Sequence, residues 1–125
     1  MELTIINTFT DQPFKGNPAA VCFLTGGSDS EWMQRMAKEI NMPVTAFIHL
    51  HKAEWHLRWF TPSIEIPICG HGTLASAFFL WGKGYVPKGS ADSLSDEKRA
   101  SHCKIRSWNG AIGVPIINRA GDCCP

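Results

Sequence analysis

The sequence predicts an α+β domain in which a strongly curved, barrel-like mixed sheet wraps around one central helix. Residues 73–81 are apolar on nearly every side of a helix, so other elements have to enclose them. About six segments rich in β-branched and aromatic residues are typical of strands. Residues 28–41 have the period of an amphipathic helix. The chain has 125 residues, 44% of them hydrophobic, which suits one domain with a real core.

The first part of the chain predicts two strands and the amphipathic helix. Residues 3–9 form a β-branched strand, and residues 19–24 form a short, largely buried strand after a proline-rich loop. Ser28 and Glu31 have the spacing of a capping box at the start of the helix. The helix is expected to end near Asn41, because a proline follows two residues later.

A hairpin and the central helix come next. Residues 45–51 and 54–60 are predicted strands joined by a two-residue turn. The helix 73–81 follows, with Thr73 as a candidate N-cap or first-turn residue and Gly82 as the C-terminal stop. At 1.5 Å per residue it is about 15 Å long, too short to span a membrane.

The last part of the chain has a different composition. Residues 87–101 are polar and charged and are predicted to form a linker. Residues 102–117 are predicted to form a second hairpin around Asn109 and Gly110, a pair typical of tight hairpin turns. We therefore expect residues 1–125 to form a single lobe.

Charge and cysteine usage exclude several classes of protein. A formal net charge of +1 gives no electrostatic basis for binding nucleic acid or a membrane surface. The N-terminus lacks the basic region and apolar run of a signal peptide. The five cysteines are odd in number and include no Cys-x-x-Cys pair. We expect a cytoplasmic protein without disulfides.

Three sequence blocks together resemble one known family. They are Asp-Gln-Pro-Phe-Lys-Gly-Asn-Pro-Ala-Ala-Val at 11–21, Leu-Arg-Trp-Phe-Thr-Pro at 57–62 and Glu-Ile-Pro-Ile-Cys-Gly-His-Gly-Thr-Leu-Ala-Ser-Ala at 65–77. In this order and spacing they resemble the N-terminal lobe of the phenazine-biosynthesis PhzF-like family. The resemblance covers residues 1–84 well, and residues 102–114 are weakly similar.

The resemblance implies the diaminopimelate-epimerase fold, in which two similar lobes flank an active-site cleft. It implies isomerase or epimerase chemistry, in which a proton moves on a small carboxylate substrate without a metal or organic cofactor. His71 then matches the catalytic histidine, and Asn17, Gly70, Gly72 and Thr73 match substrate-binding positions. Two structural alternatives remain open: His71 satisfies loop hydrogen bonds, and Asn17 is a turn residue before proline.

The resemblance also shows two departures from the family pattern. The family's Asn-Leu-Ser-Glu-Thr block reads Asn-Met-Pro-Val-Thr here, so Val44 occupies the position of the acid/base glutamate. Valine cannot accept or donate a proton. The partner lobe, which carries the family's other catalytic acid, is not among the 125 residues. We expect impaired catalysis, or alternatively a non-catalytic module that binds small anions or proteins. A homodimer would imitate the two-lobed enzyme, with a cleft between two His71 sites.

Other residues have weaker claims to function. Glu65 is the carboxylate nearest in sequence to the Cys-Gly-His block, and a structural role is favoured over a relocated base. Cys69 invites comparison with cysteine-dependent epimerases of the same fold, whereas the PhzF-like pattern makes it a packing residue. His49, His51 and His56 have a spacing that suits zinc, but no cysteine or acidic ligand is fixed nearby, and we predict no metal site.

Overall fold

The structure is a computed structural model that describes residues 1–10, 12 and 14–86. Beyond them it describes the backbone of short strands within 93–124. Among the described residues, no helix is long and apolar enough to cross a membrane.

The centre of the fold is a mixed sheet. Strands β1 (Glu2–Thr8) and β2 (Asn17–Leu24) are antiparallel, β2 is parallel to β3 (Thr45–His51), and β3 is antiparallel to β4 (Glu54–Phe60). The short strand β5 (Glu65–Ile66) pairs with the end of β4. The parallel pair requires a crossover, and the first helix supplies it.

Further strands extend the sheet from β4. The additional elements are β6 (Ser93–Asp96), β7 (His102–Lys104), β8 (Arg106–Trp108), β9 (Ala111–Gly113), β10 (Ile116–Ile117) and β11 (Cys123–Cys124). The sheet order is β1-β2-β3-β4-β6-β7-β10-β11, and β8 pairs with β9 separately. Among the described strands no pairing joins β1 to β11, so the sheet is open. The α+β class is confirmed, but the barrel-like closure is not observed. The predicted linker 87–101 lies outside the described residues except for the backbone of β6.

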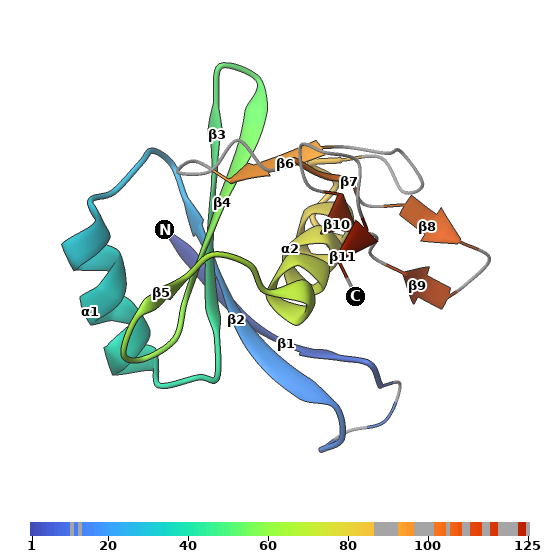
Figure 1. The fold of residues 1–125 in the computed structure, drawn as a ribbon, viewed down its shortest axis with the longest axis horizontal. Coiled ribbons are helices and arrows are strands. Elements are labelled where there is room, and N and C mark those ends of the chain that lie inside the picture. Colours follow the sequence, from blue (N-terminus) through green and yellow to red (C-terminus); the bar gives the residue numbers. More distant parts are fainter. Residues whose placement is uncertain are drawn as a thin grey trace.

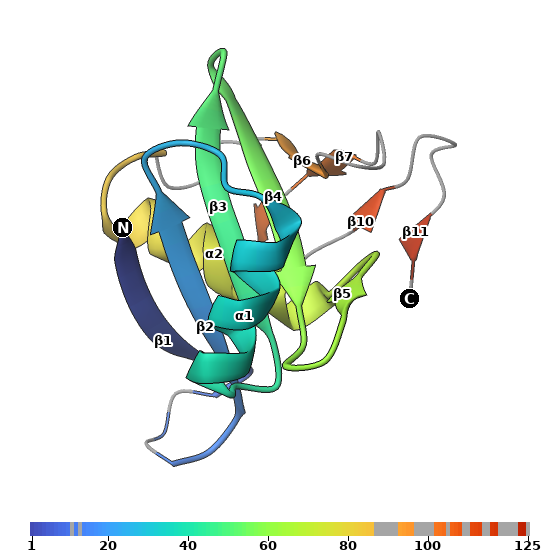
Figure 2. The same ribbon diagram turned by 90° about the vertical axis from the view of Figure 1, so that its left-hand side faces the viewer.

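Two helices cover opposite faces of this sheet. Helix α1 (Ser30–Ile40) lies on one face and α2 (Gly70–Gly82) on the other, as the two views show (Figures 1 and 2). Alternate strand residues therefore enter two different cores. The α1 core consists of Cys22, Leu24, Met33, Ala37, Phe47 and Phe60. The α2 core includes Ala19, Val21, Val44, Ala46, Ile48, Leu57, Trp59, Cys69, Ala75, Ala77, Phe79 and Leu80.

The sequence placed the first helix correctly but not its cap. Asp29, not Ser28, is the N-cap, and its Oδ1 atom accepts the Trp32 N–H at 2.8 Å. The two neighbouring residues are both good caps, so spacing alone does not decide between them. The helix ends where predicted, at Asn41 in the left-handed conformation with φ 55°.

The second helix begins three residues earlier than predicted. Of the two roles predicted for Thr73, the N-cap is taken by Cys69, whose sulfur accepts the Gly72 N–H. Thr73 lies within the first turn, and its hydroxyl donates to the Cys69 carbonyl at 2.8 Å. Ser76 bonds the Gly72 carbonyl in the same way, which satisfies two buried hydroxyls inside an otherwise apolar helix.

Candidate functional site

The predicted site lies where the N-terminus of α2 meets the start of β2. Asn17 opens β2, and its carbonyl accepts the Thr8 hydroxyl at 2.9 Å. The backbone carbonyl of the next residue, Pro18, interacts with the imidazole of His71. The structure thus brings the Asn17-Pro18 segment and His71 together, although they are more than fifty residues apart in the chain.

His71 forms a second contact that the sequence interpretation missed. The Cys69 sulfur lies 3.3 Å from His71 Nδ1 and also receives the Gly72 N–H at 3.4 Å. Burial raises the pKa of Cys69, and hydrogen bonds from the Gly72 and His71 amides only partly oppose this. The thiol is therefore protonated near neutral pH. We assign the thiol as the donor to Nδ1, which leaves the imidazole proton on Nε2.

The electrostatics of His71 favour a neutral imidazole. Burial lowers the pKa of His71 below its ordinary value of 6.5, and the Pro18 carbonyl acts in the opposite direction more weakly. Its Nε2 atom is buried and has no partner of normal hydrogen-bond geometry among the described residues. Because Nδ1 is occupied by the thiol, the Pro18 carbonyl can act only on the Nε2 proton, and its geometry leaves this N–H incompletely satisfied.

The glycines and threonine of the block differ in accessibility. Gly72 and Thr73 are buried, and their amide N–H groups bond the sulfur and the carbonyl of Cys69. Gly70 is exposed at the first position of the helix. The structure therefore presents Gly70 at the surface and keeps the amides of Gly72 and Thr73 inside. A role for the latter two in substrate binding stays a prediction.

Val44 lies in the α2 core. Its side chain is 1% exposed and belongs to the same apolar cluster as Cys69 and Ala75. Its carbonyl accepts the Ala20 N–H at 3.0 Å, which fixes the start of β3 against β2. The position that resembles the family glutamate is thus a hydrocarbon contact.

Glu65 is engaged away from the candidate site. Its two carboxylate oxygens accept from Arg58 Nε at 2.8 Å and from a terminal guanidinium nitrogen at 2.9 Å. The same Arg58 nitrogen donates to the Ser30 hydroxyl at 2.7 Å, at the start of α1. Arg58 alternates along β4 with Leu57 and Trp59 of the α2 core, so this ion pair faces α1. The geometry supports the structural interpretation of Glu65.

The hairpin histidines lie close together. The His49 and His56 rings are cross-strand partners stacked with centroids 5.2 Å apart, and His51 meets His56 edge-on at 5.8 Å. Within the described part of the chain, no group of three or more histidine, cysteine or acidic side chains has a metal-binding arrangement. Cys22 and Cys69 are free and buried, and burial raises the pKa of Cys22 to about 11.

The missed contact had a signal in the sequence. An N-cap side chain turns back over the first helical turn, where residues two and three positions later present their N–H groups. With the helix start placed correctly, Cys69 is the N-cap and His71 lies two positions later, within reach of the Cys69 side chain. The error in the helix start therefore concealed the thiol–imidazole contact.

Sequence comparisons identify relatives of this chain. The family model for phenazine biosynthesis-like proteins matches residues 6–113. The chain is 53% identical over 82 residues to an uncharacterized isomerase of Halalkalibacterium halodurans, covering 66% of this chain and 31% of that protein. It is 45% identical over 91 residues to a human phenazine biosynthesis-like domain-containing protein, covering 66% and 32%. The chain spans about a third of the length of these relatives.

Solved structures show the same relationship. A PhzF-family protein from Enterococcus faecalis superimposes with a TM-score of 0.77 at 34% identity, over 86% of this chain and 40% of that one. A phenazine biosynthesis PhzC/PhzF protein from Clostridium difficile gives a TM-score of 0.75 at 34% identity, with the same coverage. The family model covers most of the chain, and the fold agrees with it. The chain therefore belongs to the phenazine biosynthesis-like, or PhzF, family.

Proposed function

We propose that this chain binds a small carboxylate or similar anion at the N-terminus of α2 and does not carry out proton transfer. The observation that carries the proposal is Val44, which is buried in the apolar core at the position of the family's acid/base glutamate. Proton transfer requires a titratable group within hydrogen-bond reach of the substrate. Valine provides none.

Nearby groups do not replace the missing base. Glu65 is held by Arg58 on the opposite face of the sheet. The pKa of Cys69 is raised by burial, so a thiolate is disfavoured at neutral pH. His71 is neutral and shares Nδ1 with the Cys69 thiol, which leaves it a donor at Nε2.

Three features favour anion binding at this position. The Nε2 atom of His71 lacks a partner of normal geometry among the described residues. The Gly70 N–H is at the first position of the helix, where backbone N–H groups have no acceptor inside the helix. The positive end of the α2 dipole adds a favourable field for negative charge. Asn17 borders the same region through Pro18.

A second candidate function is isomerase activity of the family type. The Cys-Gly-His-Gly-Thr block at 69–73 is intact, and one relative at 53% identity is named an isomerase. In this case an acid/base group from outside the described residues would have to reach the His71 site. Deuterium incorporation distinguishes the two candidates, because any proton exchange at carbon requires such a group.

The test of binding uses amide NMR shifts during titration with phosphate and with benzoate. We expect weak binding, of the order of millimolar, as for a few kcal/mol of net binding energy. Gly70 and His71 are expected to shift most. His71→Asn is expected to abolish these shifts, and His51→Asn, which alters an exposed hairpin histidine, is the matched control. Shifts that are unaffected by His71→Asn, or confined to other residues, would contradict the proposal.

The test of catalysis uses small cyclic carboxylates in deuterated water. We expect no exchange above the buffer rate for the wild-type chain. Exchange that is lost in His71→Ala would show that the chain is catalytic and would favour the second candidate. Binding and exchange are measured separately, so one part of the proposal can fail without the other.

A further inference from the structure

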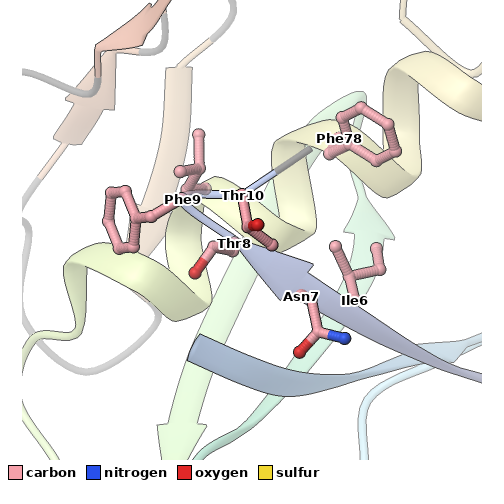
Figure 3. A pocket seen from close by; sticks show the side chains of 7 residues that line it. Ile6, Asn7, Thr8, Phe9, Thr10 and Phe78 are labelled. Carbon is pink, nitrogen blue, oxygen red and sulfur yellow. The ribbon is translucent and has the colours of Figure 1, made fainter. Parts of the chain in front are cut away.

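A cavity lies between the end of β1 and α2. It has a volume of about 270 Å³ and is lined by residues 6–10 together with Leu74 and Phe78. Figure 3 shows Phe78 of α2 on one side and the end of β1 on the other, with the Asn7 amide directed away from Phe78. A second, more open cavity of about 590 Å³ adjoins the first, because the two have lining residues in common. Together they follow α2 from Leu74 to Lys83.

The smaller cavity presents mainly apolar surface. None of the described residues that line it is charged. The Thr8 hydroxyl donates to the Asn17 carbonyl at 2.9 Å, and the Thr10 hydroxyl accepts the Gln12 N–H at 3.0 Å. Both lining hydroxyls therefore already have partners within the chain. Phe78 is 54% exposed and provides an aromatic wall. This surface favours an uncharged, apolar group.

The cavity adjoins the anion site proposed at the N-terminus of α2. His71, Leu74 and Phe78 follow one another at helical spacing, so they lie along one face of α2. Long helical side chains lean toward the preceding turn, which brings Leu74 toward His71. On the opposite side, Thr8 lines the cavity and bonds Asn17, which borders the same site. Donors for an anion and a cavity for an apolar group thus lie side by side.

The end of β1 supplies a further apolar side chain. Phe9 lines the smaller cavity, and its ring is 72% exposed. Its φ of 62° lies in the left-handed region, which bulky residues rarely adopt. Backbone conformations of this kind are concentrated at ligand clamps and active sites. In this position Phe9 can cover a group bound in the cavity.

We propose that the ligand of this site is an aliphatic monocarboxylate, with its carboxylate at Gly70 and His71 and its tail in the cavity. The inference rests on the anion site proposed above and adds the class of ligand. The two cavities lie in line along α2, which suits an extended chain better than a ring. From His71 to Phe78 the helix rises by about 10 Å, so a tail that reaches Phe78 extends over two helical turns.

Amide NMR titrations of the full chain with acetate and with octanoate test the proposal. Acetate has the charge alone, whereas octanoate adds an apolar tail. We expect octanoate to bind at least about tenfold more tightly, because its tail leaves water. Octanoate is expected to shift the amides of Gly70, His71, Leu74 and Phe78, and acetate only the first two. Equal affinities, with shifts limited to Gly70 and His71, would overturn this inference and leave the anion site standing.

Two variants locate the tail. Phe78→Ser removes the aromatic wall and is expected to weaken octanoate binding at least about threefold. Leu50→Ser is the matched control, because Leu50 is 49% exposed on β3 and lines neither cavity. Circular dichroism checks that both variants are folded.

The remaining outcomes also decide the proposal. Octanoate affinity that is the same in Phe78→Ser as in wild type would place the tail elsewhere and overturn the inference. Octanoate affinity that is unchanged by His71→Asn would overturn it too, because the carboxylate would then lie away from the N-terminus of α2. If neither acetate nor octanoate binds, both the anion site and this inference are wrong.

Discussion

At the scale of single residues, the candidate site depends on how one helical turn is capped. Cys69 accepts the Gly72 N–H and contacts His71, so one side chain both starts α2 and orients the imidazole. A serine or aspartate at this position would cap equally well but would not offer the same large, weakly polar contact. Val44 belongs to the same apolar core as Cys69.

The Arg58–Glu65 ion pair allows a prediction about stability. Arg58 is 5% exposed and bonds both Glu65 and Ser30. Arg58→Ala removes the ion-pair partner of Glu65, whose side chain is 23% exposed, and is expected to cost about 2–3 kcal/mol of unfolding free energy. Urea denaturation measures this cost. Arg35→Ala, in α1, is the control and is expected to change stability by less than about 0.5 kcal/mol. Equal effects of the two substitutions would contradict the structural role of the pair.

The pKa of His71 allows a prediction about pH. Because burial lowers this pKa below 6.5, the unfolded chain binds a proton more readily than the folded chain. The contribution of His71 is therefore fully present above pH 6.5 and decreases as the pH falls toward the lowered native pKa. His71→Gln is expected to reduce the loss of thermal stability between pH 7.5 and 5, relative to wild type. His51→Gln, at an exposed position, is the control. If His51→Gln reduced the loss of thermal stability as much as His71→Gln does, the pH effect could not be attributed to His71.

At the scale of elements, the sequence predicted most of the fold but not the first turn of α2. The β3–β4 hairpin and both helices were predicted because their hydrophobic periods are long and clear. The sequence left Thr73 as either a cap or a first-turn residue, because threonine is a common cap and cysteine is not. Its hydroxyl is instead used inside the helix, an arrangement set by the burial of α2.

Close packing at Gly72 provides a prediction for α2. A Cβ atom at this position would lie 2.8 Å from Trp59 Cδ1, closer than side chains tolerate. Gly72→Ala is therefore expected to destabilise the fold by about 1–3 kcal/mol through overpacking. Gly82→Ala in the same helix is the control, because nothing lies within 4 Å of its Cβ position. It is expected to be neutral or to stabilise by up to about 1 kcal/mol. A Gly72→Ala variant with the same unfolding free energy as wild type would show that α2 does not pack this closely against Trp59 of β4.

At the scale of the whole molecule, one sheet serves two cores. β2, β3 and β4 send alternate side chains to α1 and to α2. Loss of either helix would therefore expose one face of strands that also form the other core. Val21 and Cys22 illustrate this, because adjacent residues belong to different cores. Shared strands of this kind favour a single cooperative unit.

This arrangement predicts that both cores unfold together. Trp32 packs against the α1 core and Trp59 belongs to the α2 core, so their signals report on opposite faces of the sheet. In protein labelled with 5-fluorotryptophan, the two resonances are expected to lose native intensity at the same urea concentration. Trp32→Phe and Trp59→Phe assign the resonances. In each variant the remaining probe and the far-ultraviolet circular dichroism are expected to share one midpoint, because a two-state fold has one free energy of unfolding. Loss of the Trp32 signal at a clearly lower urea concentration would instead show that α1 detaches while β2–β4 and α2 remain folded.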